Sequence, residues 1–156
     1  HMADIILKHN GTLDKYIGDA IMAFWGAPLP DKNHAENAVK ASIEMLEELK
    51  AVNAELKEKG MGMEVRIGIG LNTGVVTIGN IGSQKKLNYT VVGDAVNLAS
   101  RLESLTKEHK TGLLLSEYTY EMVKDKIPCV MLGNVKVKGR EKAVDIYTPE
   151  VLKKDT

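Results

Sequence analysis

The most informative part of the sequence is Tyr89-Thr-Val-Val-Gly-Asp-Ala-Val-Asn-Leu-Ala-Ser-Arg-Leu-Glu-Ser104. Its first residues are aromatic or β-branched and predict a strand, and the Gly-Asp pair that follows predicts a turn. The remainder predicts an amphipathic helix, because apolar residues recur at helical spacing on one face. The residues of that face are Val96, Ala99, Leu102 and Leu105.

The same predicted helix carries a polar pair. Asn97 and Arg101 are four residues apart, so an amide and a guanidinium lie side by side on one face. A guanidinium forks onto phosphate oxygens, and the N-terminus of a helix adds partial positive charge. The pair suits a polyanion such as a triphosphate, although an Asn/Arg pair by itself is more often part of a solvated face.

A second informative string is Asp14-Lys-Tyr-Ile-Gly-Asp-Ala-Ile-Met-Ala-Phe-Trp-Gly26. Apolar and polar residues alternate on both sides of Gly18-Asp19, which predicts a tight hairpin with a carboxylate at its tip. By itself, an Asp at such a tip is most often simple turn chemistry.

Together, the two strings resemble the class III nucleotide cyclases, the adenylate and guanylate cyclases, and the resemblance runs from residue 3 to about residue 148. It implies one catalytic domain, over residues 3–150. In that family the Asn and Arg of the helix stabilise the transition state of cyclisation, which gives this role to Asn97 and Arg101. The family's hairpin carries one of two metal-binding Asp residues, and Asp19 matches it.

The resemblance also implies which base is selected. Lys15 stands where adenylate cyclases carry Lys and guanylate cyclases carry Glu, and Thr90 stands where many guanylate cyclases carry Cys. Lys15 can donate to adenine N1, and Thr90 can exchange a hydrogen bond with the 6-amino group. Guanine would leave donors facing donors, which costs about 1–3 kcal/mol for each mispaired group. ATP is therefore the predicted substrate, and a guanylate cyclase is the first alternative.

Two further residues have family counterparts. Lys138 resembles the family's phosphate-binding Lys near the C-terminal hairpin, and Lys136 and Arg140 are the alternatives for that role. Asp94 forms a Gly-Asp pair like that of Asp19, but its family counterpart mostly shapes the turn before the helix.

Cyclisation needs two divalent ions, Mg²⁺ or Mn²⁺, of which one activates the ribose 3′-hydroxyl and both stabilise phosphate charge. The family's other metal Asp lies on a first strand, in an Asp-Ile-x-Gly-Phe-Thr string that this sequence lacks; Asp4-Ile5 shares only the dipeptide. We therefore expect a domain without its first strand and helix, with impaired activity. The family's sites form between two domains, which predicts a head-to-tail homodimer.

The bulk composition excludes several classes of protein. Lys and Arg number 21, as do Asp and Glu, which argues against nucleic-acid or anionic-membrane partners. The single Cys129 excludes an internal disulfide and fits a reducing compartment. No membrane-spanning stretch or signal peptide is evident, so a cytoplasmic location is predicted. A non-catalytic dimerisation module remains an alternative of a different class.

The order of predicted elements indicates an α+β fold: a ferredoxin-like antiparallel sheet with helices packed on one face. A clean alternation predicts a strand over residues 64–71, with Gly68 and Gly70 on a face that something approaches closely. Helices are otherwise expected at 3–9, 33–59, before 110 and after 116, and strands at 12–17, 20–25, 75–78, 113–115, 130–132, 135–137 and 143–147.

Overall fold

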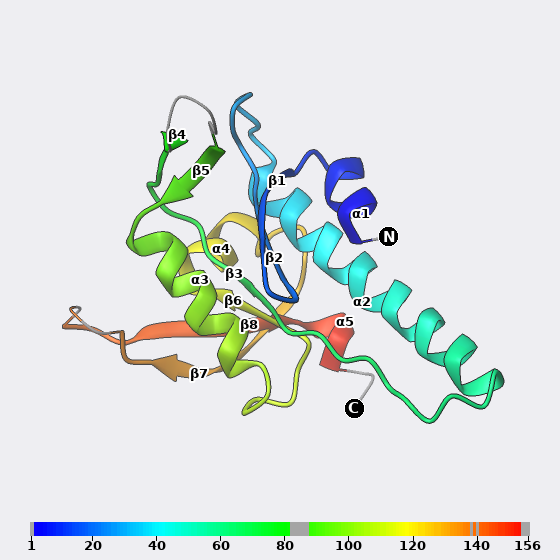
Figure 1. Ribbon diagram of the computed structural model, residues 1–156. Helices are drawn as coiled ribbons and strands as arrows, with labels where there is room; N and C mark the ends of the chain where they lie inside the picture. The colour runs from blue at the N-terminus through cyan, green and yellow to red at the C-terminus, as the bar shows by residue number, and fades with distance from the viewer. Residues whose placement is uncertain (1, 82–87, 138, 140, 154–156) are drawn as a thin grey trace.

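The computed structural model describes residues 2–81, 88–137, 139 and 141–153, and its helices and strands alternate as an α+β fold (Figure 1). The predicted fold class is confirmed. The elements in chain order are α1 (Met2–Lys8), β1 (Thr12–Ile17), β2 (Ala20–Phe24), α2 (His34–Glu58), β3 (Ile69–Leu71), β4 (Thr77–Ile81), β5 (Asn88–Val92), α3 (Asp94–Leu105), β6 (Leu113–Ser116), α4 (Glu117–Val123), β7 (Cys129–Val135), β8 (Val144–Pro149) and α5 (Glu150–Lys153).

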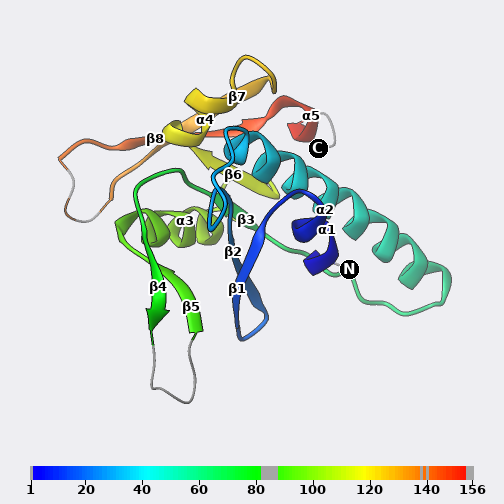
Figure 2. The same ribbon diagram turned by 90° about the horizontal axis from the view of Figure 1, so that it is seen from above.

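The described strands form three sheets. The largest has the order β3-β6-β8-β7, in which β3 and β6 are parallel and the other pairs are antiparallel. The parallel pair follows from the long connection through β4, β5 and α3, since parallel strands cannot be joined by a tight turn. The hairpins β1–β2 and β4–β5 each form a separate two-stranded sheet, and they lie beside each other (Figure 1, Figure 2).

Helices cover both faces of the main sheet, whereas the sequence predicted cover on one face. The reason is β6, whose residues are all buried and whose side chains alternate between the two faces. Leu114 packs with leucines of α3, while Leu113 and Leu115 pack with α2 and α4. A strand that is apolar on both faces needs a helical layer on each side.

The strand predicted over residues 64–71 is shorter than expected, because only Ile69–Leu71 pairs, with β6. Upstream of it, the side chain of Asn53 on α2 bonds both backbone groups of Val65, at 2.8 and 2.9 Å. An amide side chain thus takes the bonds that a neighbouring strand would make. The strand predicted at 75–78 is displaced to Thr77–Ile81.

Within the described part of the chain, every helix is too short or too polar to cross a lipid bilayer.

Candidate active site

The helix that carries the Asn/Arg pair begins at a glycine that its geometry requires. Gly93 has φ of 147°, a conformation that side chains disfavour, and its carbonyl accepts from Val96 N–H at 3.1 Å and from Asn97 N–H at 3.4 Å. The strand β5 therefore passes directly into α3, as the Gly-Asp pair predicted. Asp94 is exposed in the first turn of α3.

The apolar face of α3 fixes the helix on the sheet. Leu98, Leu102 and Leu105 are buried against β6, β7 and β8. The sequence predicted Val96 on this face, whereas in the structure Leu98 is buried there and Val96 is only partly buried. Asn97 and Arg101, one turn apart, are both exposed. The packing thus presents the polar pair to solvent, where a ligand can reach it.

The glycines of β3 let α3 approach the sheet closely, as predicted. A Cβ on Gly70 would collide with the backbone of α3 at Ala99 and Glu103, and one on Gly68 would collide with Thr106. Backbone of the helix therefore rests on backbone of the strand. This contact sets the depth of α3 and so the position of its exposed face.

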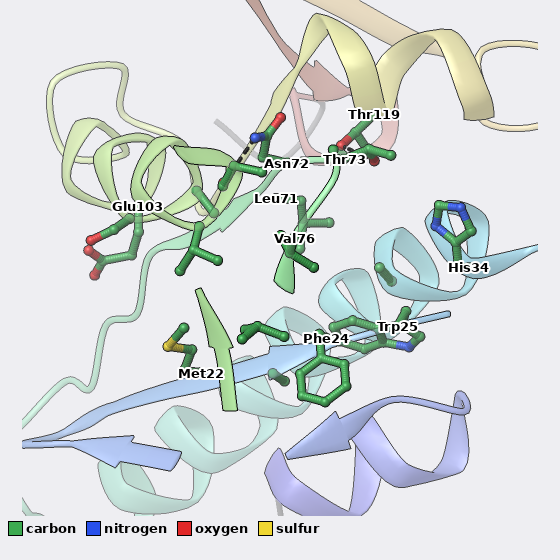
Figure 3. A pocket seen from close by; sticks show the side chains of 18 of the residues that line it. Met22, Phe24, Trp25, His34, Leu71, Asn72, Thr73, Val76, Glu103 and Thr119 are labelled. Atoms are coloured by element: carbon green, nitrogen blue, oxygen red, sulfur yellow. Dashed lines mark hydrogen bonds between the residues drawn. The ribbon is translucent and has the colours of Figure 1, made fainter. Parts of the chain in front are cut away.

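Asn72, just after β3, ties the start of α3 to β6. Its side-chain N–H donates to the carbonyl of Ala95 at 2.9 Å (Figure 3). Its side-chain oxygen accepts from the Ser116 hydroxyl at 2.6 Å. The Ser116 oxygen in turn accepts from Thr119 N–H at 3.3 Å, as the N-cap of α4. These contacts could not be predicted from the sequence, because the partners of an amide side chain are set by tertiary structure.

The hairpin β1–β2 carries the other candidate residues. Lys15 is exposed on β1, and Asp19 is exposed in the turn before β2, which contains Gly18 with φ of 60°. The predicted hairpin with a carboxylate at its tip is present. The described strands β1 and β5 contact each other, so the strand of Lys15 lies beside the strand that contains Thr90.

One hydrogen bond joins these two strands directly. The carboxylate of Asp14 accepts from Val91 N–H at 3.1 Å, across 77 residues of sequence. The backbone of Thr90, in β5, pairs with Gly79 of β4, and the side chain of Thr90 is not among the described side chains. Sequence reasoning missed Asp14; the signal available was an acidic residue within a strand, where Asp is disfavoured.

Two of the phosphate-binding candidates, Lys138 and Arg140, lie outside the described residues. Lys136 is exposed immediately after β7. The choice among these three phosphate-binding candidates stays a prediction.

The helix before the hairpin is anchored by a carboxylate. Glu44 on α2 accepts from Lys8 at 2.6 Å and contacts His9 at 2.5 Å, and these contacts hold the pKa of the Glu44 carboxyl below its ordinary value. Trp25 donates to the carbonyl of His9 at 3.0 Å. The two ends of the β1–β2 hairpin are therefore tied to α1 and, through it, to α2.

The described side chains supply few metal ligands. Within residues 2–81, 88–137, 139 and 141–153, no three His, Cys, Asp or Glu side chains gather around one point. Mg²⁺ is commonly held by one or two carboxylates together with phosphate oxygens of the substrate. Asp19, exposed on a turn, fits one such carboxylate. Burial raises the pKa of Cys129 to about 11, so this thiol stays protonated and is a poor ligand.

A cleft of about 280 Å³ separates the hairpin from the main sheet (Figure 3). It lies between β2, the end of β3, α3 and the first turns of α2, and its lining is mostly apolar, with Met22, Phe24 and Val76 among it. Of the candidate residues whose side chains the structure describes, Lys15, Asp19, Asn97 and Arg101 do not line it. Its walls include two strand edges, because among the described strands β2 pairs with β1 alone and β3 pairs with β6 alone.

Comparison with known proteins identifies the family to which this fold belongs. Residues 1–148 match the family described as the adenylate and guanylate cyclase catalytic domain. The chain belongs to this family. Adenylate cyclase 1 of Rhizobium meliloti (strain 1021) is 37% identical over 93% of the chain.

Two solved cyclase structures agree. The adenylyl cyclase CyaB from P. aeruginosa is 40% identical with a TM-score of 0.84, over 94% of this chain and 74% of that one. The guanylyl cyclase Cya2 is 39% identical with a TM-score of 0.81, over 94% and 73%. The cyclase-family chain spans 22% of the length of the R. meliloti relative.

Proposed function

We propose that this domain converts ATP into 3′,5′-cyclic AMP and pyrophosphate. The ribose 3′-oxygen attacks the α-phosphorus, a new P–O bond closes the ring, and the bond to the β-phosphate oxygen breaks as pyrophosphate leaves. The observation that carries the proposal is the Asn97/Arg101 pair, exposed on a helix whose other face is fixed on the sheet. A positioned pair of donors is the requirement for stabilising phosphate charge in a transition state.

In this proposal Arg101 donates to the phosphate oxygens that gain charge during the attack, because a guanidinium matches their geometry. Asn97 holds the ribose, so that the 3′-oxygen and the α-phosphorus stay in line. Neither residue transfers a proton. Both act because α3 is held in place before the substrate arrives.

Asp19 would hold a divalent cation together with the phosphates, and Mg²⁺ or Mn²⁺ bound there would lower the pKa of the attacking hydroxyl and neutralise charge on the phosphates. One carboxylate is a weak site without the substrate. A second carboxylate, matching the family's Asp-Ile-x-Gly-Phe-Thr string, is needed for both ions.

Base recognition is assigned to Lys15 and Thr90. The two residues belong to adjacent strands of different sheets, which supports a shared role. Lys138 is proposed to bind phosphate. In a head-to-tail homodimer, Asp19 of one protomer and Asn97 of its partner would complete one site, which fits their positions on different elements.

The test measures the turnover of ATP and of GTP by the same protein. We define the extended chain as residues 1–156 preceded by the first-strand segment of a related cyclase, including the Asp-Ile-x-Gly-Phe-Thr string. With Mg²⁺ or Mn²⁺, the extended chain is expected to form cyclic AMP from ATP in preference to cyclic GMP from GTP. Equal or better turnover of GTP would overturn the base assignment.

A guanylate cyclase is the second candidate, since Cya2 resembles the chain almost as closely as CyaB does. The same assay separates the two. A non-catalytic dimerisation module is a third reading, and an extended chain that dimerises but turns over neither nucleotide would support it.

A further inference from the structure

The hydrogen bond from Val91 N–H to the Asp14 carboxylate joins two sheets that share no ladder. The β1–β2 hairpin and the β4–β5 hairpin are separate, so backbone pairing does not set the position of one against the other. The bond is 3.1 Å long and partly buried. A charged acceptor in a partly buried place makes a stronger and more directional bond than an exposed one.

Asp14 can reach Val91 because β1 is irregular at this residue. Leu13 pairs with Ala23 and Lys15 pairs with Met22, so that Asp14 is the extra residue of a bulge. A bulge bends its strand and turns a side chain out of the regular alternation. An acidic residue in a bulge that points at a neighbouring amide indicates a built contact between the two hairpins.

This hydrogen bond lies next to both residues that are proposed to recognise the base. Asp14 immediately precedes Lys15, and Val91 immediately follows Thr90. We infer that Asp14 is a positioning residue for base recognition, which fixes the strand of Lys15 against the strand of Thr90 so that both face one purine edge. This inference rests on the proposed function, because it requires that Lys15 and Thr90 read the base.

The chemistry of the contact predicts a graded response. Asp14→Asn keeps a side-chain oxygen that can accept from Val91 N–H, whereas Asp14→Ala removes the acceptor. Because an error of about 1 Å in placing a reactive group can cost about 100-fold, a looser register is expected to lower the preference for ATP over GTP roughly tenfold. Asn should retain most of the preference, and Ala should lose it.

A matched control exists in the same chain. The Glu117 carboxylate accepts from Asp145 N–H at 3.1 Å, a bond of the same kind and length between α4 and β8. Glu117→Ala breaks that bond and leaves the two hairpins untouched. It reports what the loss of such a bond does to stability alone.

The experiment uses the chain with Mg²⁺ and has two readouts. Dissociation constants for ATP and GTP are measured by competition with a fluorescent nucleotide, for the parent, Asp14→Asn, Asp14→Ala and Glu117→Ala. Hydrogen exchange of the Val91 amide is followed by NMR on the same proteins. We expect faster exchange at Val91 and a smaller ratio of the GTP dissociation constant to the ATP dissociation constant in Asp14→Ala only.

The outcomes separate the two proposals. If the Asp14→Ala chain keeps the parent's ratio of GTP to ATP dissociation constants, the positioning role is overturned and the proposed function still stands. Unchanged exchange at Val91 also overturns it. A parent chain with no preference for ATP overturns the base assignment itself, and the inference with it.

Discussion

At the scale of single residues, the proposed chemistry depends on the exposed pair on α3, Asn97 and Arg101. Replacing Asn97 or Arg101 by Ala in the extended chain should lower kcat by about 10²–10³-fold, the usual cost of one donor that acts on the transition state, with a smaller change in KM. Ser104→Ala is the control, since Ser104 is exposed on the same helix and, among the described residues, donates to the carbonyl of Ser100 in that helix. A variant with near-normal kcat would remove that residue from the mechanism.

The residues proposed to recognise the base, Lys15 and Thr90, give a second prediction at this scale. Lys15→Glu places an acceptor where adenine N1 needs a donor, and each mispaired group costs about 1–3 kcal/mol. We expect the ratio of kcat/KM for ATP to that for GTP to fall by roughly 10–100-fold in the extended chain, and to fall further with Thr90→Cys. Lys57→Glu makes the same change of charge on an exposed residue of α2 that has no proposed role in the site, and it should leave this ratio unchanged. An unaltered ratio in Lys15→Glu would refute the assignment of Lys15.

Much of what concerns single residues could be predicted from the sequence. The Gly18-Asp19 turn, the Gly93-Asp94 start of α3 and the close approach at Gly70 depend on local conformation or on a missing side chain, which short strings encode. The contacts of Asp14 and Asn72 were not predictable in the same way. Their partners are brought to them by folding, 77 residues away for Asp14 and 23 and 44 residues away for Asn72.

At the scale of elements, the packing of α3 on β3 should control both stability and activity. Gly70→Ala places a methyl group against the backbone of α3, with the carbonyl carbon of Leu102 at 3.0 Å, and a backbone contact cannot be relieved by a rotamer change. We expect a loss of about 1–3 kcal/mol in the free energy of unfolding, measured by urea denaturation. Gly79→Ala, on β4, meets nothing within 4 Å and should be close to neutral. Equal stability of the two variants would contradict the account of close packing.

The strand predicted at residues 64–71 shows why elements are harder to predict than residues. Its alternation is correct, since Ile69 and Leu71 pack toward α2 while Gly68 and Gly70 face α3. A strand also needs a neighbouring strand to pair with, however, and among the described strands β3 has one such neighbour, β6. The period of a sequence sets which face is buried, but hydrogen-bonded length is set by the neighbouring strands.

Among the described strands, β2 and β3 each have an unpaired edge in the cleft between the β1–β2 hairpin and the main sheet. These edges lead to a prediction about a further strand. Ile69 N–H donates to the carbonyl of Gly112 at 2.9 Å, on the β6 side, so the amide groups of Gly68 and Gly70 point to the opposite edge. In the extended chain we expect an added strand to lie there, because exposed strand edges recruit partners. Hydrogen exchange at Gly68, Gly70 and β2 should then slow relative to residues 1–156, while exchange in β7 stays the same. Unchanged exchange at β2 would place the added segment elsewhere.

At the scale of the whole molecule, the decisive question is which protomer supplies which part of a site. Residues 1–156 offer one matching metal carboxylate, Asp19, whereas the proposed reaction needs two on the same protomer. A homodimer of this chain cannot replace the second, so we expect little or no cyclic AMP from residues 1–156 alone. Substantial production by that polypeptide, free of longer species, would show that the account of the metal site is wrong.

A complementation experiment also tests which protomer supplies which residues of a site. The extended chain carrying Asn97→Ala holds both metal carboxylates but lacks a transition-state donor, so it should be nearly inactive alone. Residues 1–156 supply an intact Lys15, Thr90, Asn97 and Arg101. In a mixture, a heterodimer has one site with both carboxylates from one protomer and all four other groups from its partner. Cyclic AMP formation should therefore appear only on mixing.

Adding Arg101→Ala to residues 1–156 should abolish this rescue, whereas Ser104→Ala should preserve it. Failure of the mixture, with heterodimers verified by cross-linking, would rule out a site shared between protomers in this arrangement.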